Sequence, residues 1–218
     1  MNDDEPQQID PMDEQRAERE ALEHARAFLH ANLEGSLLLD GEFNENIKRV
    51  PFVLDHETGK LIASVPVATF HASEVIFRVP EEADDAMGLL VTAEEVEESS
   101  ATDRWMAFHG EPDHVRWAAY WIDGAKHGPW VFDGDAMMRP NPLAPIEPRV
   151  CKLLNSDEHR ARLPELARAR AGAEITKPLC VGVCPHGVWL RAPFGVALAR
   201  FDEPIEDPDA ERVMNALK

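Results

Sequence analysis

Two cysteines and a histidine form the first group of residues that could do chemistry: Cys180, Cys184 and His186. Thiolates and imidazoles are the side chains that zinc prefers. If the chain from Cys180 to Cys184 is one extended strand, the two Cα atoms lie about 13 Å apart. That distance is too long for both thiolates to reach one zinc ion, or for one disulfide. We therefore expect structural thiols and an exposed turn histidine rather than a metal site.

Four further histidines could each ligate haem iron or transfer a proton: His71, His109, His114 and His127. A neutral imidazole can do either near neutral pH. Their spacing selects none of them, and histidines mostly occupy surface or hydrogen-bonded core positions. A structural role is the preferred interpretation, and a functional histidine is the alternative.

An aromatic series runs through the middle of the chain and consists of Trp105, Phe108, Trp117, Tyr120, Trp121, Trp130 and Phe132. Such a series can line a pocket for a planar cofactor. Tryptophan more often fills a core or a subunit interface, where its N–H needs one partner, and we favour that interpretation. The sequence lacks the motifs of a serine-hydrolase elbow, of a phosphate-binding P-loop and of a zinc protease.

Charge and hydropathy limit the classes of partner. The chain has 22 Lys and Arg against 41 Asp and Glu, a net charge of −19. Because nucleic acids are bound mainly through neutralisation of their phosphates, this balance disfavours a nucleic-acid partner. No apolar run approaches the roughly 20 residues that span a bilayer, and the first residues do not form an export signal. We therefore expect a cytoplasmic protein without a membrane partner.

One locally basic element interrupts this acidic chain, at 149–170. It carries Arg149, Lys152, Arg160, Arg162, Arg168 and Arg170 against Asp157, Glu158 and Glu165. We expect it to pack against the chain's own carboxylates. The alternative is a binding face for an anionic ligand or an acidic partner.

The patterning predicts one N-terminal helix followed by many short strands. Asp10 and Pro11 begin the helix, which runs to about Leu33 and ends at Gly35. Alternation then predicts strands at 36–40, 47–54, 60–65, 67–72, 75–79, 88–92, 105–109 and 130–133, with one helix at 114–122. Such strands favour a small antiparallel barrel, which has no exposed edges.

The last third of the chain predicts a second unit. Four prolines predict that 139–148 is neither a helix nor a central strand but a linker. Beyond it we expect a helix over about 150–171, a hairpin of 179–183 with 188–191, a strand at 196–201 and a closing helix capped near Asp207. Alternation places Leu190 toward the core and Trp189 on the opposite face, where it could serve a ligand.

The segments 181–183, 187–190, 200–201 and 203–204 resemble the small α+β domain of the haem-utilisation branch of the pyridoxamine-phosphate-oxidase-like proteins. The resemblance extends over most of residues 15–218 and implies an FMN-type split barrel followed by that domain. Relatives typically carry His-Met-Asn-x-Asp-His in the first helix of the domain. Here Leu153 and Glu158 stand at its histidine positions. A ligand role of those histidines therefore does not carry over.

The resemblance also implies where a flavin would bind. In flavin-binding relatives, the stretch after the third strand presents hydroxyl, amide and cationic side chains to the cofactor phosphate. Here 67–80 is mainly apolar, and 55–103 holds Lys60 and Arg78 against twelve Asp or Glu. A phosphate needs strong donors, so this composition favours loss of the flavin site. If FMN or haem is retained, we expect His71, Ser73 and Arg78 to contact it.

The sequence thus predicts an α+β, mainly β fold, a split antiparallel barrel followed by a small α+β domain. Its parts are a disordered tail at 1–9, the barrel domain at 10–138, the linker at 139–148 and the C-terminal domain at 149–218. We expect a homodimer that binds a small molecule or regulates, without a cofactor. The alternative is a flavin- or haem-linked oxidoreductase that uses a cleft at the dimer interface.

Overall fold

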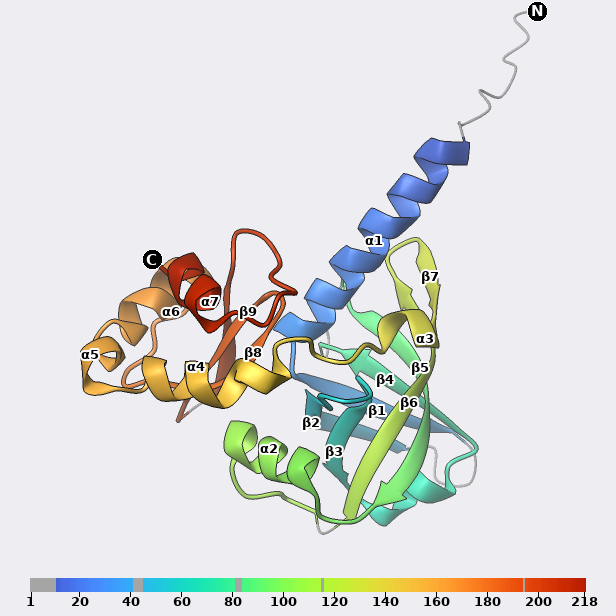
Figure 1. Ribbon diagram of the computed structural model, residues 1–218. Coiled ribbons are helices and arrows are strands. Elements are labelled where there is room, and N and C mark those ends of the chain that lie inside the picture. Colours follow the sequence, from blue (N-terminus) through green and yellow to red (C-terminus); the bar gives the residue numbers. More distant parts are fainter. Residues whose placement is uncertain (1–10, 41–44, 81–83, 115, 194) are drawn as a thin grey trace, which may run out of the picture.

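The fold is α+β, as the sequence predicts. It combines a closed six-stranded antiparallel barrel, extended by one more strand, with a three-stranded sheet that carries helices (Figure 1). This computed structural model describes residues 11–40, 45–80, 84–114, 116–193 and 195–218. The predicted tail at 1–9 lies outside the described residues.

The barrel follows the predicted alternation of apolar and polar residues. Its strands are β1 (Glu34–Asp40), β2 (Glu45–Leu54), β3 (Leu61–Val65), β4 (Glu74–Val79), β5 (Met87–Val96) and β6 (Arg116–His127), and β7 (Trp130–Asp133) extends the sheet. The order is β3-β2-β1-β4-β5-β6-β7, and pairing of β3 with β6 closes the barrel. In β4, Val75, Phe77 and Val79 are buried inside while Arg78 is exposed outside. Alternation therefore separates one core face from one outer face.

The first helix, α1 (Pro11–Ala31), begins and ends close to its predicted limits. Ala25 and Leu29 are buried at helical spacing. Helix α1 contacts β7, β10 and the short helix α3 (Gly134–Met137), so it spans the barrel and the C-terminal sheet (Figure 1). In the described part of the chain, no helix has the length and apolar content that a membrane span requires.

The C-terminal unit is a three-stranded sheet with helices on one face. Its elements are η2 (Ala144–Ile146), α4 (Glu147–Leu154), α5 (Asp157–Arg160), α6 (Leu163–Ala171), β8 (Leu179–Cys184), β9 (Gly187–Ala192), β10 (Gly195–Arg200) and α7 (Ala210–Ala216). The hairpin β8–β9 and the strand β10 lie where the sequence predicts them. Leu190 packs under the helices, while Trp189 belongs to the barrel's core. Trp189 is 3% exposed and donates from Nε1 to the His30 carbonyl, so its face is buried between the two units.

Three predicted elements of the barrel are wrong. The stretch 67–72 is not a strand but η1 (Val67–His71), because β3 and β4 each already pair with two other strands. The stretch 105–109 belongs to α2 (Ser100–His109), in which the Ser99 backbone N–H donates to Thr102 Oγ1. The predicted helix at 114–122 is wrong because the chain from Arg116 to His127 is strand β6, which pairs with β3 and β5.

Two predictions for the second unit also need correction. The segment 139–148 contains η2 and the start of α4, because proline is compatible with the first turn of a helix. The long helix at 150–171 is divided into α4, α5 and α6. One break follows Asn155, whose side chain pairs with the backbone of Cys180, and the next precedes Pro164 at the start of α6.

A buried polar cluster joins the barrel to the C-terminal unit. Arg104 of α2 pairs with Glu147 of α4, and their side chains are 9% and 12% exposed. The second oxygen of Glu147 accepts from the Val183 backbone N–H at 2.8 Å and lies 3.4 Å from His56 Nε2. Burial alone would raise the pKa of Glu147, but the hydrogen bond with His56 and the charge of Arg104 lower it below its usual value.

Candidate functional site

A cleft of about 650 Å³ opens on the outer face of the barrel, beside α1. Ala21 and His24 of α1 line one side, and the turn between β6 and β7 lines the other. The floor comes from the ends of β4, β5 and β6, where Arg78, Gly88 and Lys126 lie. The volume is within the range of about 300 to 1,000 Å³ that is typical of small-molecule sites.

Two cations flank an opening in this floor. Gly88 pairs with Arg78 on one side and with Lys126 on the other, so the three residues form a row across β4, β5 and β6. Neighbouring strands lie about 4.8 Å apart, which separates the Arg78 and Lys126 Cα atoms by roughly 10 Å. A Cβ added at Gly88 would meet no atom within 4 Å. The space above Gly88 is therefore open to a group that both cations can reach.

Arg78 and Lys126 form no ion pair with any residue that the structure describes. Asp84 and Asp85 also line the cleft and reduce its positive potential. The arrangement suits an anionic group held between the two cations.

Aromatic and imidazole rings form the wall of the cleft. His24 and His127 are stacked with their ring centroids 5.6 Å apart, and Phe28 lies 4.5 Å from His127. Burial, followed by the nearby His24, lowers the pKa of His127. Trp130, the first residue of β7, lines the same cleft. Of these rings, those of His24, His127 and Trp130 line the cleft, where they offer a surface to a planar ligand.

The structure does not bring the three predicted cofactor contacts together. His71 ends η1, and Ser73 precedes β4 and donates from its backbone N–H to the Asp40 carbonyl. Arg78 lies near the opposite end of β4, roughly 17 Å along the strand from Ser73. Arg78 lines the cleft and the other two do not. His71 and Ser73 remain predictions without a pocket that they share with Arg78.

The other histidines and cysteines singled out in the sequence lie among hydrogen bonds and hydrophobic contacts that stabilise the fold. His109 donates from Nε2 to the Phe52 carbonyl at 2.9 Å, and burial lowers its pKa to about 4. His114 exchanges hydrogen bonds with Ser64 through its backbone. Cys180 and Cys184 lie in different hydrophobic clusters, as separated structural thiols. His186 is half-buried beside His30 rather than exposed, which corrects the prediction of an exposed turn residue.

One thiol contact was not expected. Cys151 of α4 lies 3.6 Å from Cys180, measured between the sulfur atoms. The pairing depends on how α4 packs against β8, which residue spacing does not specify. Among the described residues, no group of three His, Cys, Asp or Glu side chains is arranged to hold a metal ion.

The aromatic series divides between the core and the surface. Its buried members are Trp105, Phe108, Trp117, Tyr120 and Phe132. Trp121 is 44% exposed on the outer face of β6, with the Lys60 ammonium 3.6 Å from the centroid of its ring. Trp130 is the member that lines the cleft. The core interpretation is thus correct for most of the series.

Lys126 lines the cleft, but the residue patterns do not identify it as a site residue. A helix predicted at 114–122 hides the pairing of β5 with β6, and this pairing is what places Lys126 opposite Gly88. The signal that could have found it is the run from Arg116 to His127, which is long enough to cross the barrel as one strand.

Comparisons with known proteins support the fold and leave the function open. No protein-family model matches the chain, and no curated protein matches it. A protein of unknown function from Agrobacterium tumefaciens has a similar structure, with a TM-score of 0.68 and 17% identity over 98% of this chain and 100% of the other. A haem-binding protein from Mycobacterium smegmatis aligns with a TM-score of 0.41 and 16% identity, over 90% and 96%. The closed antiparallel barrel fits a split-barrel fold.

Proposed function

We propose that this protein binds a small, planar, anionic molecule in the outer cleft, as a cytoplasmic ligand-binding or regulatory protein. The observation that carries the proposal is the row of Arg78, Gly88 and Lys126, in which two cations flank an open position. An anionic group above Gly88 would receive charge-assisted hydrogen bonds from both sides. Trp130 and the stacked His24 and His127 offer a surface for the planar body of the ligand.

We further propose that two copies pair through this outer face. Leu38, Ile76 and Leu90 are register partners on β1, β4 and β5 and form an apolar row, of which Leu38 and Ile76 also line the cleft. Leu90 is 44% exposed, and Val131 of β7 is 72% exposed. Contiguous apolar patches of this kind are typical of subunit interfaces. Light scattering should give twice the monomer mass of 24.4 kDa, and the monomer mass at micromolar concentration would contradict pairing.

FMN fits this cleft poorly. Its phosphate carries nearly two negative charges, whereas the two cations of the floor are opposed by Asp84 and Asp85 at the rim. We expect the purified protein to carry no FMN and to bind added FMN more weakly than a micromolar constant. A stoichiometric yellow protein would contradict this expectation.

Haem is a second candidate because two imidazoles lie in the cleft. A neutral histidine can ligate haem iron, and burial lowers the pKa of His127. His24 or His127 would then hold the iron, and the bound haem would supply oxidation and reduction chemistry. Added haem should in that case give a shifted Soret band that His127→Ala removes and His159→Ala leaves unchanged.

The main proposal is tested with two fluorescent probes of similar shape. 8-Anilinonaphthalene-1-sulfonate is an aromatic monoanion, and N-phenyl-1-naphthylamine has the same rings without the charge. We expect the double variant Arg78→Ala/Lys126→Ala to bind the sulfonate at least tenfold more weakly, about 1.4 kcal/mol, and the amine equally well.

A matched control removes two cations elsewhere on the barrel. Lys60→Ala/Arg116→Ala makes the same change of net charge, but both cations pair with glutamates outside the cleft. This variant should bind the sulfonate as the wild type does. An equal loss in both double variants would attribute binding to the overall charge, and no loss in the cleft variant would refute the proposed site.

A further inference from the structure

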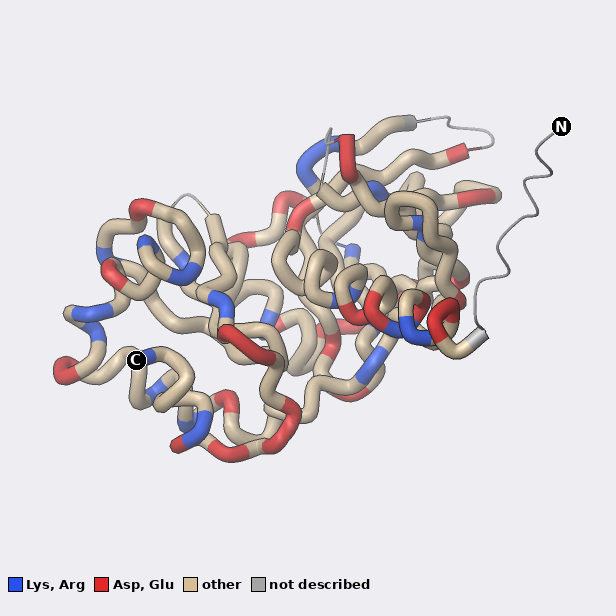
Figure 2. The backbone as a smooth tube through the Cα atoms, turned by 90° about the horizontal axis from the view of Figure 1, so that it is seen from above, with Lys and Arg blue, Asp and Glu red and all other residues tan. Residues whose placement is uncertain are grey.

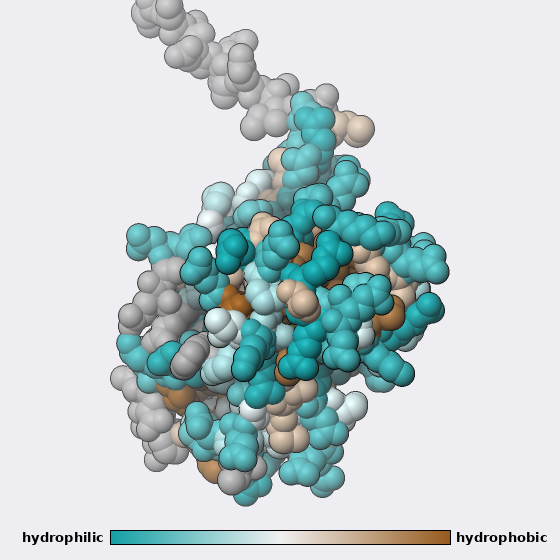
Figure 3. All heavy atoms as spheres, turned by 90° about the vertical axis from the view of Figure 1, so that its left-hand side faces the viewer, coloured by the Kyte–Doolittle hydropathy of each residue, from teal (hydrophilic) through white to brown (hydrophobic). Residues whose placement is uncertain are grey.

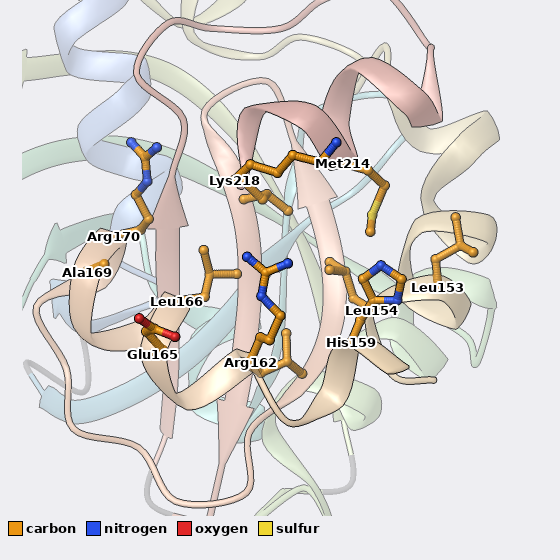
Figure 4. Close-up of a pocket in the computed structure, with 12 residues that line it drawn as sticks. Leu153, Leu154, His159, Arg162, Glu165, Leu166, Ala169, Arg170, Met214 and Lys218 are labelled. Atoms are coloured by element: carbon orange, nitrogen blue, oxygen red, sulfur yellow. The ribbon is translucent and has the colours of Figure 1, made fainter. Parts of the chain in front are cut away.

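The basic segment 149–170 lines a second pocket, far from the barrel cleft. This pocket of about 370 Å³ lies among the helices α4, α6 and α7 (Figure 4). Leu154 and Leu163 form its buried floor, at 4% and 1% exposure. Four partly exposed apolar side chains line its sides: Leu153, Leu166, Met214 and Leu217. The interior is thus suited to a hydrocarbon chain.

Cationic side chains surround this apolar interior. Arg162 projects between Leu166 and His159 toward Lys218, across the middle of the pocket (Figure 4). Arg170 also lines the pocket, but it pairs with Asp202. Within the part of the chain that the structure describes, Arg162 forms no ion pair. Its guanidinium is therefore available to an anion that enters the pocket.

The charge around this pocket is opposite to that of the protein as a whole. Figure 2 shows Lys and Arg alongside Asp and Glu in the lobe that contains the C-terminus, and three cations, Arg162, Arg170 and Lys218, are among the residues that line the pocket. Glu165 is the acidic residue among those that line the pocket. Figure 3 views this side of the molecule and shows a surface that is hydrophilic over most of its area, with apolar residues visible between polar ones. A ligand with an anionic head group can pair with this polar rim while its hydrocarbon chain lies inside.

We infer that this pocket binds a medium-chain carboxylate, with the chain among the leucines and the carboxylate on Arg162. Arg binds a carboxylate through two parallel N–H donors, which is the strongest geometry for this pair. The apolar interior contributes through each methylene that it removes from water. The site is independent of the barrel cleft, since the two share no lining residue.

The inference is tested by calorimetric titration of the full chain with decanoate and with decan-1-ol. We expect decanoate to bind with a micromolar constant and the alcohol at least tenfold more weakly, because the alcohol lacks the charge that pairs with Arg162. In a series from hexanoate through octanoate to decanoate, each added methylene should tighten binding by up to about fourfold. Arg162→Ala should weaken decanoate at least tenfold.

Two variants distinguish binding in this pocket from binding by surface charge or by the barrel cleft. Arg168→Ala removes an exposed cation of the same helix that does not line the pocket, and it should bind decanoate as the wild type does. Arg78→Ala/Lys126→Ala should also leave decanoate binding unchanged. No heat up to millimolar decanoate, equal affinity for the alcohol, or equal losses in Arg162→Ala and Arg168→Ala would overturn the inference. Loss of decanoate binding in Arg78→Ala/Lys126→Ala alone would show that the carboxylate binds in the barrel cleft instead.

Discussion

The polar cluster between the two units and the cleft on the barrel use charge in opposite ways. Arg104 and Glu147 are paired and nearly buried, and each also contacts other groups of the cluster or its surroundings. Arg78 and Lys126 are exposed and form no ion pair among the described residues. A paired buried charge fixes the position of two elements, whereas unpaired exposed charges keep their hydrogen-bonding capacity for a ligand. This difference is what the proposed function rests on: the cluster connects the two units, and the cleft keeps two cations for the proposed ligand.

The strongest test of the comparison is Glu147→Ala. The substitution leaves Arg104 buried without its partner, which typically costs about 3–5 kcal/mol. We expect a loss of that size in the free energy of unfolding, measured by urea denaturation. Glu95→Ala is the matched control, because Glu95 pairs with Arg116 at the surface, where the two side chains are 48% and 52% exposed. Surface pairs contribute about 0–1 kcal/mol. Similar losses in both variants would show that the buried cluster has no special role.

A second test compares neighbouring residues of β9 that face opposite cores. Trp189→Ala should cost about 3–5 kcal/mol and Leu190→Ala about 2–5 kcal/mol, because each leaves a cavity. Trp189 packs against Phe108 of α2 at 5.4 Å between ring centroids, so its loss should also loosen the contact between the units. Thermal and urea unfolding measure both effects. An unchanged melting temperature for Trp189→Ala would contradict the core position of Trp189 and favour a ligand-binding role for it.

Residue patterns predict the parts of this fold that depend on local alternation. Strands such as β4 and β9, and the helix α1, have one buried face that recurs at a regular period. The alternation of apolar and polar residues does not identify the element type where other parts of the protein cover both faces of a segment. Residues 105–109 and 116–122 are rich in aromatic and apolar residues, and neither a period of two nor one of 3.6 stands out clearly. Trp105 and Trp117 meet at 5.3 Å between ring centroids because α2 packs against β2 and β3, and β3 pairs with the start of β6, an arrangement that the sequence alone does not reveal.

One residue of the candidate site, Arg78, could be predicted from the sequence. Arg78 is a cation on the exposed face of a predicted strand, and the structure places it in the cleft. Lys126 and His24 reach the same cleft from β6 and α1, which lie far from Arg78 in the sequence. Their convergence depends on strand order and helix docking. Both are tertiary properties that spacing along the chain does not specify.

A smaller effect is expected from the half-buried side chain of His30, whose Nδ1 atom is enclosed. Burial lowers its pKa to about 3, whereas the unfolded chain has a value near 6.5. Between these values the unfolded state binds the additional proton, so stability falls as the pH falls from about 6.5 toward 3. From pH 7.5 to pH 5, this one group should cost about 2 kcal/mol of the free energy of unfolding. His30→Leu should remove that share of the pH dependence, and an unchanged slope in urea titrations would contradict the assignment.

The last test, with the smallest expected effect on stability, places a carboxylate between the two cations of the cleft. Because a Cβ at Gly88 would meet no atom within 4 Å, Gly88→Ala and Gly88→Glu should both fold, with free energies of unfolding within about 0.5 kcal/mol of each other. The carboxylate introduced by Gly88→Glu should lie between Arg78 and Lys126 and occupy the position of the proposed anion. Binding of 8-anilinonaphthalene-1-sulfonate should therefore weaken at least tenfold in Gly88→Glu and stay unchanged in Gly88→Ala. Equal binding by the two variants would show that the anion lies elsewhere, and a loss of more than about 2 kcal/mol in Gly88→Glu would show that the position is not open.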